Sequence, residues 1–240
     1  MTWDLDTWKI TQAILDLRYD FAFSLWDRAG AFWNAASDQW GELSIQEAAP
    51  NKTNLAVDDR FTVSVMTERA NITDYLPTQS LDGFVDKTAT FADLLEGHLG
   101  VEVYNRIGFR IKYLKPFDEM EAATKQLLQA EVIHIPEGPH FGIDGPPNEA
   151  NYATQIEGES HGATVRLHTF NQAVNFGVGP KAQWTDLKAS RQTRKGIVFD
   201  VDYYTTKPSE VEQVGVQPWL ENAHRLIRRD AGAFLNTHLK

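Results

Sequence analysis

The 240-residue sequence predicts an α+β fold, in which helices pack on one face of a largely antiparallel sheet and the opposite face is charged. Three observations support this fold class. Strand-like and helix-like segments do not follow one another as the regular βα series of a parallel sheet. Several strand-like segments alternate apolar with charged side chains, as half-buried strands do. The helix-like segments carry an apolar stripe, which indicates that they cover one face of the sheet.

The N-terminal part of the chain is typical of a strand followed by a helix. In the segment 13–21, apolar side chains alternate with polar and charged ones, which predicts a strand. From Trp26 to Trp40, large aromatic or alanine side chains recur every three or four positions, and Gly41 can end the resulting helix. We expect the tryptophans of this stripe in the core, because buried aromatic rings usually serve packing.

The next elements are less regular. The segment 50–60 is polar and rich in turn residues, so we expect a loop, and Phe61 begins another strand. Ser80 and Gly100 are typical of the start and the end of a helix whose apolar stripe lies between them. A further short helix is expected around 120–129.

Two long segments, 101–115 and 197–204, alternate most strictly and are predicted to be half-buried strands. Their polar faces carry opposite charges, with Arg106, Arg110 and Lys112 on the first and Asp200 and Asp202 on the second. If the two strands share a sheet, cations and carboxylates meet on one face.

Glycine and proline residues interrupt the segment 135–158, which we expect to be an irregular lid-like connection. The chain then forms a single domain, or two lobes, 1–130 and 160–240, joined by this segment. Two short strands are predicted at 163–170 and 172–178, with a tight turn between them.

The predicted charged face is the candidate binding site. We expect it to contain Asp16, Arg18, Asp20, Arg106, Arg110, Lys112, Arg166, His168, Asp200 and Asp202. Arginine can clamp a carboxylate or a phosphate through two parallel hydrogen bonds. Two alternatives stay open: the aspartates neutralise the arginines internally, or the arginines bind an anionic group of a partner. Gly108 removes a side chain between the two arginines, which allows close approach by a ligand or a β-bulge.

Composition narrows the class of protein. The chain has no cysteine, which removes disulfides, thiolate metal sites and cysteine nucleophiles. No apolar run approaches the roughly 20 residues of a membrane span, and we expect a cytoplasmic protein without a membrane partner. The net charge of −10 disfavours broad nucleic-acid binding. A last helix is predicted from Pro218 almost to the end of the chain, and its Arg225, Arg228 and Arg229 fit its solvated side better than a nucleic-acid interface.

Four short motifs, at 14–19, 105–110, 199–204 and 219–224, occur in one order along the chain. Together they resemble the hallmarks of an uncharacterised, sporadically distributed prokaryotic family of about this length. Members of that family usually continue past the second arginine with an aromatic residue and an asparagine, where this chain has Ile111 and Lys112. The resemblance implies an intracellular protein of bacterial, archaeal or phage origin, and it supplies no activity.

We therefore predict a non-enzymatic binding protein, without cofactor or metal, that recognises a partner protein or a small anionic ligand. The binding residues are predicted to be Arg18, Arg106, Gly108, Arg110, Arg166, His168, Asp200 and Asp202. By analogy, such a protein could be an antitoxin, an immunity protein or a defence-associated accessory factor. A homodimer is left open. The alternative is a divalent-metal-dependent hydrolase with Asp200, Asp202 and His168 as catalytic residues.

Overall fold

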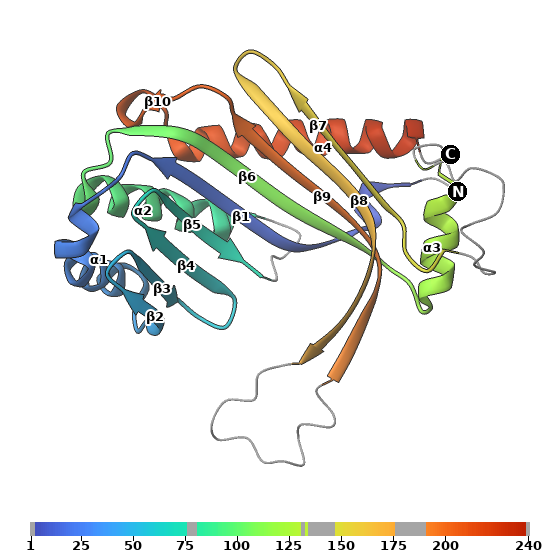
Figure 1. Cartoon of the computed structure of the whole chain (residues 1–240), viewed down its shortest axis with the longest axis horizontal. Coiled ribbons are helices and arrows are strands. Elements are labelled where there is room, and N and C mark those ends of the chain that lie inside the picture. The colour runs from blue at the N-terminus through green and yellow to red at the C-terminus, as the bar shows by residue number, and fades with distance from the viewer. Residues whose placement is uncertain (1–2, 76–80, 131–132, 134–146, 176–190, 239–240) are drawn as a thin grey trace.

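The computed structural model describes residues 3–75, 81–130, 133, 147–175 and 191–238, and it shows an α+β fold (Figure 1). Within these ranges, ten antiparallel strands form one open sheet, and four α-helices accompany it. The strands are β1 (Lys9–Tyr19), β2 (Ser44–Ala49), β3 (Lys52–Ala56), β4 (Phe61–Met66), β5 (Arg69–Asp74), β6 (Val103–Pro116), β7 (Asn151–Glu157), β8 (His161–Asn175), β9 (Arg191–Thr205) and β10 (Ser209–Glu210). The helices are α1 (Ser24–Trp40), α2 (Asp82–Leu99), α3 (Met120–Leu128) and α4 (Val216–His238), with short 3-10 turns η1 (Leu5–Thr7) and η2 (Val211–Gln213). No helix in these ranges has the length and apolar character that a membrane span requires.

The strand order of the sheet is β2-β3-β4-β5-β1-β6-β9-β8-β7, and β10 pairs with β6 beside this path. Strand β6 is hydrogen-bonded to β1 on one side and to β9 on the other, so strands from both ends of the chain belong to one sheet. The three strands with charged faces predicted at 13–21, 101–115 and 197–204 are therefore neighbours. Their adjacency gathers the predicted charged residues on one face.

Helices α2 and α4 lie behind the strands in the view of Figure 1 and cover the apolar face of the sheet. Phe84 of α2 packs against Phe109 of β6, with ring centroids 6.1 Å apart, and Phe234 of α4 stacks on Phe199 of β9 at 5.7 Å. Burial of these large rings is the main stabilising contribution to the core. Helix α2 ends as predicted at Gly100, whose φ of 66° is a left-handed C-cap, whereas Ser80 lies outside the described residues.

Helix α1 forms where the aromatic stripe predicts a helix, and the stripe is buried in part: Ala36 is buried, and Trp33 and Trp40 pack partly buried against the core. Leu25 and Phe32 are buried, whereas Trp26 is 56% exposed. Trp26 instead joins Phe21 and Phe23 in an exposed aromatic cluster, in which the rings of Phe21 and Phe23 lie 4.5 Å apart. The buried side of α1 therefore combines Phe32 with part of the predicted stripe, and the helix packs against α2.

Three short strands of the N-terminal half escaped the sequence prediction. The segment 50–60, expected to be a loop, contains β3, which pairs with β2 and β4. Only Thr53 and Leu55 of β3 are buried, so its alternation extends over five residues. Strand β5 pairs with β1 and β4 and carries no long pattern of its own. Where such short strands form is determined by pairing with neighbouring strands rather than by the β-propensity of their own residues.

Two predictions for the C-terminal half are wrong. Strand β8 continues through Asn171, which pairs with Lys195, so the predicted turn between 163–170 and 172–178 is absent from the described part of β8. The long partner strand β9 supplies hydrogen bonds along the whole of β8 and overrides the weak turn signal. Strand β7 occupies part of the segment 135–158 that was expected to be irregular. Residues 135–146 of the proposed lid lie outside the described residues.

A β-bulge in β6 changes which side chains lie on which face at one end of the sheet, so the faces predicted there are wrong. The pairing with β1 shifts by one residue at Asn105, so Tyr104 turns to the helix-covered face and donates to Glu96 of α2 at 3.4 Å. Asn105 donates to Asp20 at 2.7 Å. Asp20, which the alternation placed on the charged face, lies past the end of β1 and is exposed.

Candidate functional site

The helix-free face of the sheet carries a polar row that crosses all nine strands of the main path. Following the register from β2 to β7, the row consists of Glu47, Asn54, Ser64, Asn71, Asp16, Gly108, Tyr204, Gly162 and Glu157. Charged residues of β1, β5, β6, β8 and β9 also lie on this face, at alternate positions along their strands. We call this set the charged face: Asp16, Arg18, Arg69, Arg106, Arg110, Lys112, Arg166, His168, Asp200 and Asp202.

Arg106 lies between two carboxylates near the centre of the charged face. Its Nη1 donates to Asp16 Oδ2 and its Nη2 donates to Asp202 Oδ2, each at 2.9 Å. Asp16 also accepts from Nε of Arg18 at 3.3 Å and from Nε of Arg69. The side chains of Arg106 and Asp16 are only 15% and 8% exposed. Of the two alternatives that the sequence left open, internal neutralisation holds for Arg106.

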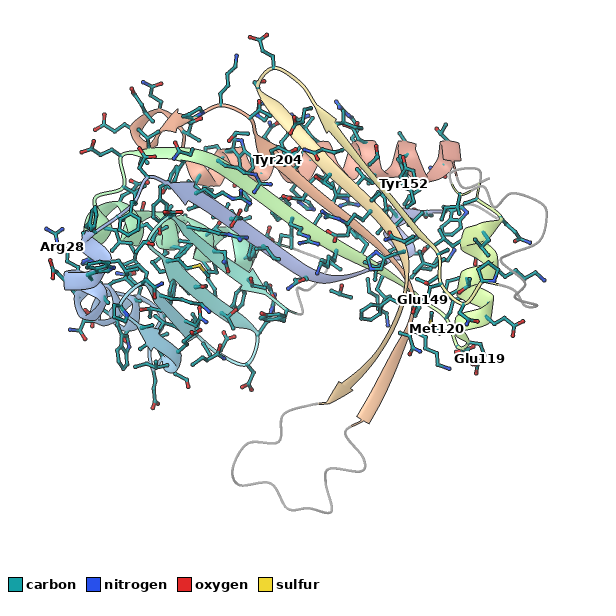
Figure 2. All side chains as sticks on the ribbon, in the orientation of Figure 1. Arg28, Glu119, Met120, Glu149, Tyr152 and Tyr204 are labelled. Atoms are coloured by element: carbon teal, nitrogen blue, oxygen red, sulfur yellow. The ribbon has the colours of Figure 1, made fainter. Side chains whose placement is uncertain are left out.

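Two glycines make room for this arrangement. A Cβ atom on Gly108 would lie 2.6 Å from Nη1 of Arg106, so the guanidinium group occupies the space above Gly108. The ring of Tyr204 stacks on this guanidinium, 4.3 Å from ring centroid to Cζ, as a cation–π contact. Opposite Tyr204, a Cβ atom on Gly162 would lie 2.7 Å from the ring; Figure 2 marks Tyr204 on this part of the sheet. Gly108 therefore accommodates Arg106, which differs from both roles that the sequence suggested for it.

Asp200 is the centre of a second ion cluster on the same face. Its side chain is 1% exposed and accepts two hydrogen bonds from Arg110, from Nε at 2.8 Å and from Nη2 at 2.5 Å. Nη1 of Arg166 lies 3.9 Å from Asp200 Oδ2, is buried, and has no hydrogen-bond partner among the described residues. Lys112 is the register partner of Asp200, yet it makes no ion pair within the described ranges. Three cations and one carboxylate give this cluster a charge of +2, and Asp202, which accepts from Arg106, faces Arg110 from the neighbouring cluster.

Burial shifts the pKa values of two side chains of this cluster, and the neighbouring cations add to both shifts. Burial lowers the pKa of Lys112, and repulsion by Arg110 lowers it further, while Asp200 acts in the opposite direction. Burial also lowers the pKa of His168; the nearby Asp200 opposes the shift, and the surrounding cations add to it. His168 is therefore neutral at pH 7. A bound anion would raise both pKa values, so the cluster is electrostatically suited to accept one.

The predicted binding residues fall into these two neighbouring clusters. Arg18, Arg106, Gly108 and Asp202 belong to the cluster around Asp16, and Arg110, Arg166 and His168 belong to the cluster around Asp200. Sequence reasoning missed Arg69, because strand β5 was not predicted. It also gave no role to Tyr204, although a position two residues after Asp202 in a strand lies on the same face.

The geometry of the aspartates bears on the hydrolase alternative. Both carboxylate oxygens of Asp200 accept from Arg110, and Asp202 accepts from Arg106. In the described part of the chain, no group of three or more histidine, aspartate or glutamate side chains is arranged to hold a metal ion. Carboxylates bonded to guanidinium groups are typical of ion pairs that position side chains. Both oxygens of Asp200 and Oδ2 of Asp202 are therefore engaged by guanidinium groups in this structure.

A scan of the chain against models of known protein families finds no match, and a search of curated proteins finds none either. The family resemblance of the four motifs and the predicted cytoplasmic location stay predictions.

Proposed function

We propose that this protein is a non-enzymatic binding protein whose charged face receives a dianionic group, such as a phosphate monoester or two adjacent carboxylates, from a partner protein or a small ligand. The supporting observation is the net charge of +2 formed by Arg110, Lys112 and Arg166 around the single carboxylate of Asp200. A dianion matches that charge. It would accept hydrogen bonds from Lys112 and Arg166, whose donors are not engaged in close ion pairs among the described residues.

The proposal is also supported by the accessibility of the charged face and by the contrast between its positive cluster and the negative charge of the whole chain. The strands that carry the Asp200 cluster have no helix in front of them in Figure 1, so a macromolecular partner can approach this face. The whole chain has a net charge of −10, which makes the cluster a local cationic exception. An acidic surface repels extended polyanions such as nucleic acids, whereas a single dianionic group can still reach the cluster.

The proposal gives different roles to the two arginines that the sequence suggested as anchors. The guanidinium group of Arg106 already donates to Asp16 and Asp202 and is covered by Tyr204. We therefore assign Arg106 to holding the face together. Lys112 and Arg166 become the main anchors. Arg110 combines both roles, because it bonds Asp200 and its side chain is still 35% exposed.

The double variant Lys112→Gln/Arg166→Gln tests the proposal. We expect the wild-type protein to bind a phosphoserine peptide with one-to-one stoichiometry in isothermal titration calorimetry. The variant should bind it at least about tenfold more weakly, since two charge-assisted hydrogen bonds are lost. The matched control is Arg225→Gln/Arg229→Gln, which removes the same charge from exposed positions of α4. Equal weakening by the control would mean that only the net charge matters and would contradict a site at Asp200.

The pH dependence of anion binding gives a second test. Sulfate remains dianionic between pH 5 and pH 8, so changes in its affinity over this range report on the protein. Because the free protein holds the pKa of His168 below its ordinary value and a bound anion raises it, binding takes up a proton. Sulfate affinity should therefore rise as the pH falls from about 7 towards 5. The variant His168→Gln should lose most of this rise, and a pH profile unchanged by the substitution would exclude His168 from the site.

A further inference from the structure

A cavity of about 940 Å³ lies on the helix-covered side of the sheet, away from the charged face. It is lined by η1, the start of α2, one side of α4 and two central strands. An ion pair between Asp6 of η1 and Arg228 of α4 ties two of its walls together. Its apolar lining consists of Leu5, Ile10, Leu81, Val85 and Leu220. This volume is within the range of cavities that hold small organic molecules.

Three of the residues that line this cavity have a buried polar atom without a hydrogen-bond partner in the described ranges. These atoms are Nε1 of Trp8, Oη of Tyr113 and Nε2 of His224. Trp8 and Tyr113 are 5% and 3% exposed, so water does not reach their polar groups freely. A buried polar group without a partner is costly, and three of them around one cavity indicate a site where a ligand completes the hydrogen bonding.

The charges around the cavity indicate the kind of ligand. Four carboxylates line it, from Asp6, Asp82, Asp86 and Glu221, against the single guanidinium group of Arg228, which gives −3 with a neutral His224. Burial lowers the pKa of His224, and the nearby Arg228 lowers it further, so the ring is neutral at pH 7. The rim therefore attracts cations.

The donors within the cavity define the other end of the ligand. The indole N–H of Trp8 can only donate, so its partner must be a hydrogen-bond acceptor. The Tyr113 hydroxyl can donate or accept, and the apolar and aromatic walls favour an apolar body between the two polar ends.

We propose that this cavity binds a small organic cation: a protonated amine with an apolar or aromatic body and a hydrogen-bond acceptor at the far end. The amine lies near Asp86 and Glu221, and the acceptor takes the hydrogen bond of Trp8. The site is independent of the anion site on the charged face, since the two lie on opposite faces of the sheet and attract opposite charges.

The test uses 2-(4-methoxyphenyl)ethylamine, which has all three features, and 3-(4-methoxyphenyl)propanoic acid, which replaces the amine by a carboxylate. The readout is the indole N–H signal of Trp8 in a ¹⁵N–¹H spectrum of the full chain, assigned with Trp8→Phe. We expect the amine to shift this signal saturably and the acid to leave it unchanged. Shifts of equal size with both compounds, or no shift up to about 10 mM amine, would overturn the proposal.

Two tyrosine variants separate a binding role of Tyr113 from a structural one. Tyr113→Phe should weaken amine binding by about fivefold or more while leaving the melting temperature of the free protein equal or higher, because it removes a buried hydroxyl without a partner. The control Tyr203→Phe changes a tyrosine of the same sheet face outside this cavity and should leave the affinity unchanged. A lower melting temperature with unaltered affinity in Tyr113→Phe would assign the hydroxyl to the fold and contradict the site.

Discussion

Replacing Asp200 by Asn should destabilise the protein by about 3 to 5 kcal/mol, the largest effect that we expect from a single substitution on the charged face. The Asp200 side chain is 1% exposed and its two oxygens accept both hydrogen bonds from Arg110. Asparagine has a similar shape but no charge, so Arg110, Lys112 and Arg166 would lose the buried carboxylate around which they cluster. Urea unfolding of the wild type and the variant measures the difference in free energy of unfolding.

The variant Asp230→Asn is the matched control for this prediction. Asp230 accepts from Arg229 at 2.7 Å in an ion pair whose side chains are 64% and 65% exposed. Exposed ion pairs contribute little to stability, so this change should alter the free energy of unfolding by less than about 0.5 kcal/mol. If Asp200→Asn had an effect equally small, the Asp200 cluster would not be a stabilising ion cluster.

Replacing Arg106 by Gln should cost about 2 to 4 kcal/mol of unfolding free energy. The change removes the hydrogen bonds to Asp16 and Asp202 together with the cation–π contact to Tyr204. Asp16 is 8% exposed and would keep only two arginines that are themselves half exposed. Gly108 would then lie beneath an unfilled space, because the guanidinium group that covers it is gone.

Arg18→Gln is the control for Arg106→Gln, since both arginines donate to the same carboxylate. The Arg18 side chain is 49% exposed and its bond to Asp16 measures 3.3 Å. We therefore expect a loss below about 1 kcal/mol, as for other exposed ion pairs. Similar losses in the two variants would show that burial of Arg106 is unimportant, and Arg106 would again be available as an anchor for a ligand.

These expectations also explain why the obvious double variant, Arg106→Gln/Arg110→Gln, is a poor test of binding. Each substitution removes a partner from a buried carboxylate, so the double variant combines a loss of stability with a loss of ligand contacts. Lys112 and Arg166 avoid this problem because neither makes a close hydrogen bond to a carboxylate among the described residues.

Strand identity and face could be predicted where alternation is long. Strands β1, β6 and β9 alternate over many residues, so the sequence indicates which of their side chains share a face. The partners in each ion pair could not be predicted from the sequence, because they depend on the register of the strands and on the side-chain rotamers. Arg110, for example, lies opposite Asp202 in the ladder but bonds to Asp200 on the diagonal. The bulge at Asn105, which turns Tyr104 to the other face, shows in the sequence only as a polar residue at an apolar position of the alternation.

The cavity behind the sheet shows the other limit of sequence reasoning. More than 100 residues of sequence separate Trp8 from Tyr113, and again Tyr113 from His224. Only the packing of α4 against β6 and η1 brings the three side chains to one cavity. In the sequence, Tyr113 continues the apolar alternation of its strand, His224 is typical of a surface group on the last helix, and Trp8 belongs to no pattern. Only the structure shows that their polar atoms lack partners.

The measurement that tests the central proposal most directly is a crystal structure of the protein with selenate, located by its anomalous scattering. Selenate is a dianion with the geometry of sulfate. We predict that it binds between Lys112 and Arg166, within hydrogen-bonding distance of both and above the Arg110–Asp200 pair. Selenate found only at other sites, at a concentration that saturates binding in solution, would contradict the assignment of this cluster as an anion site.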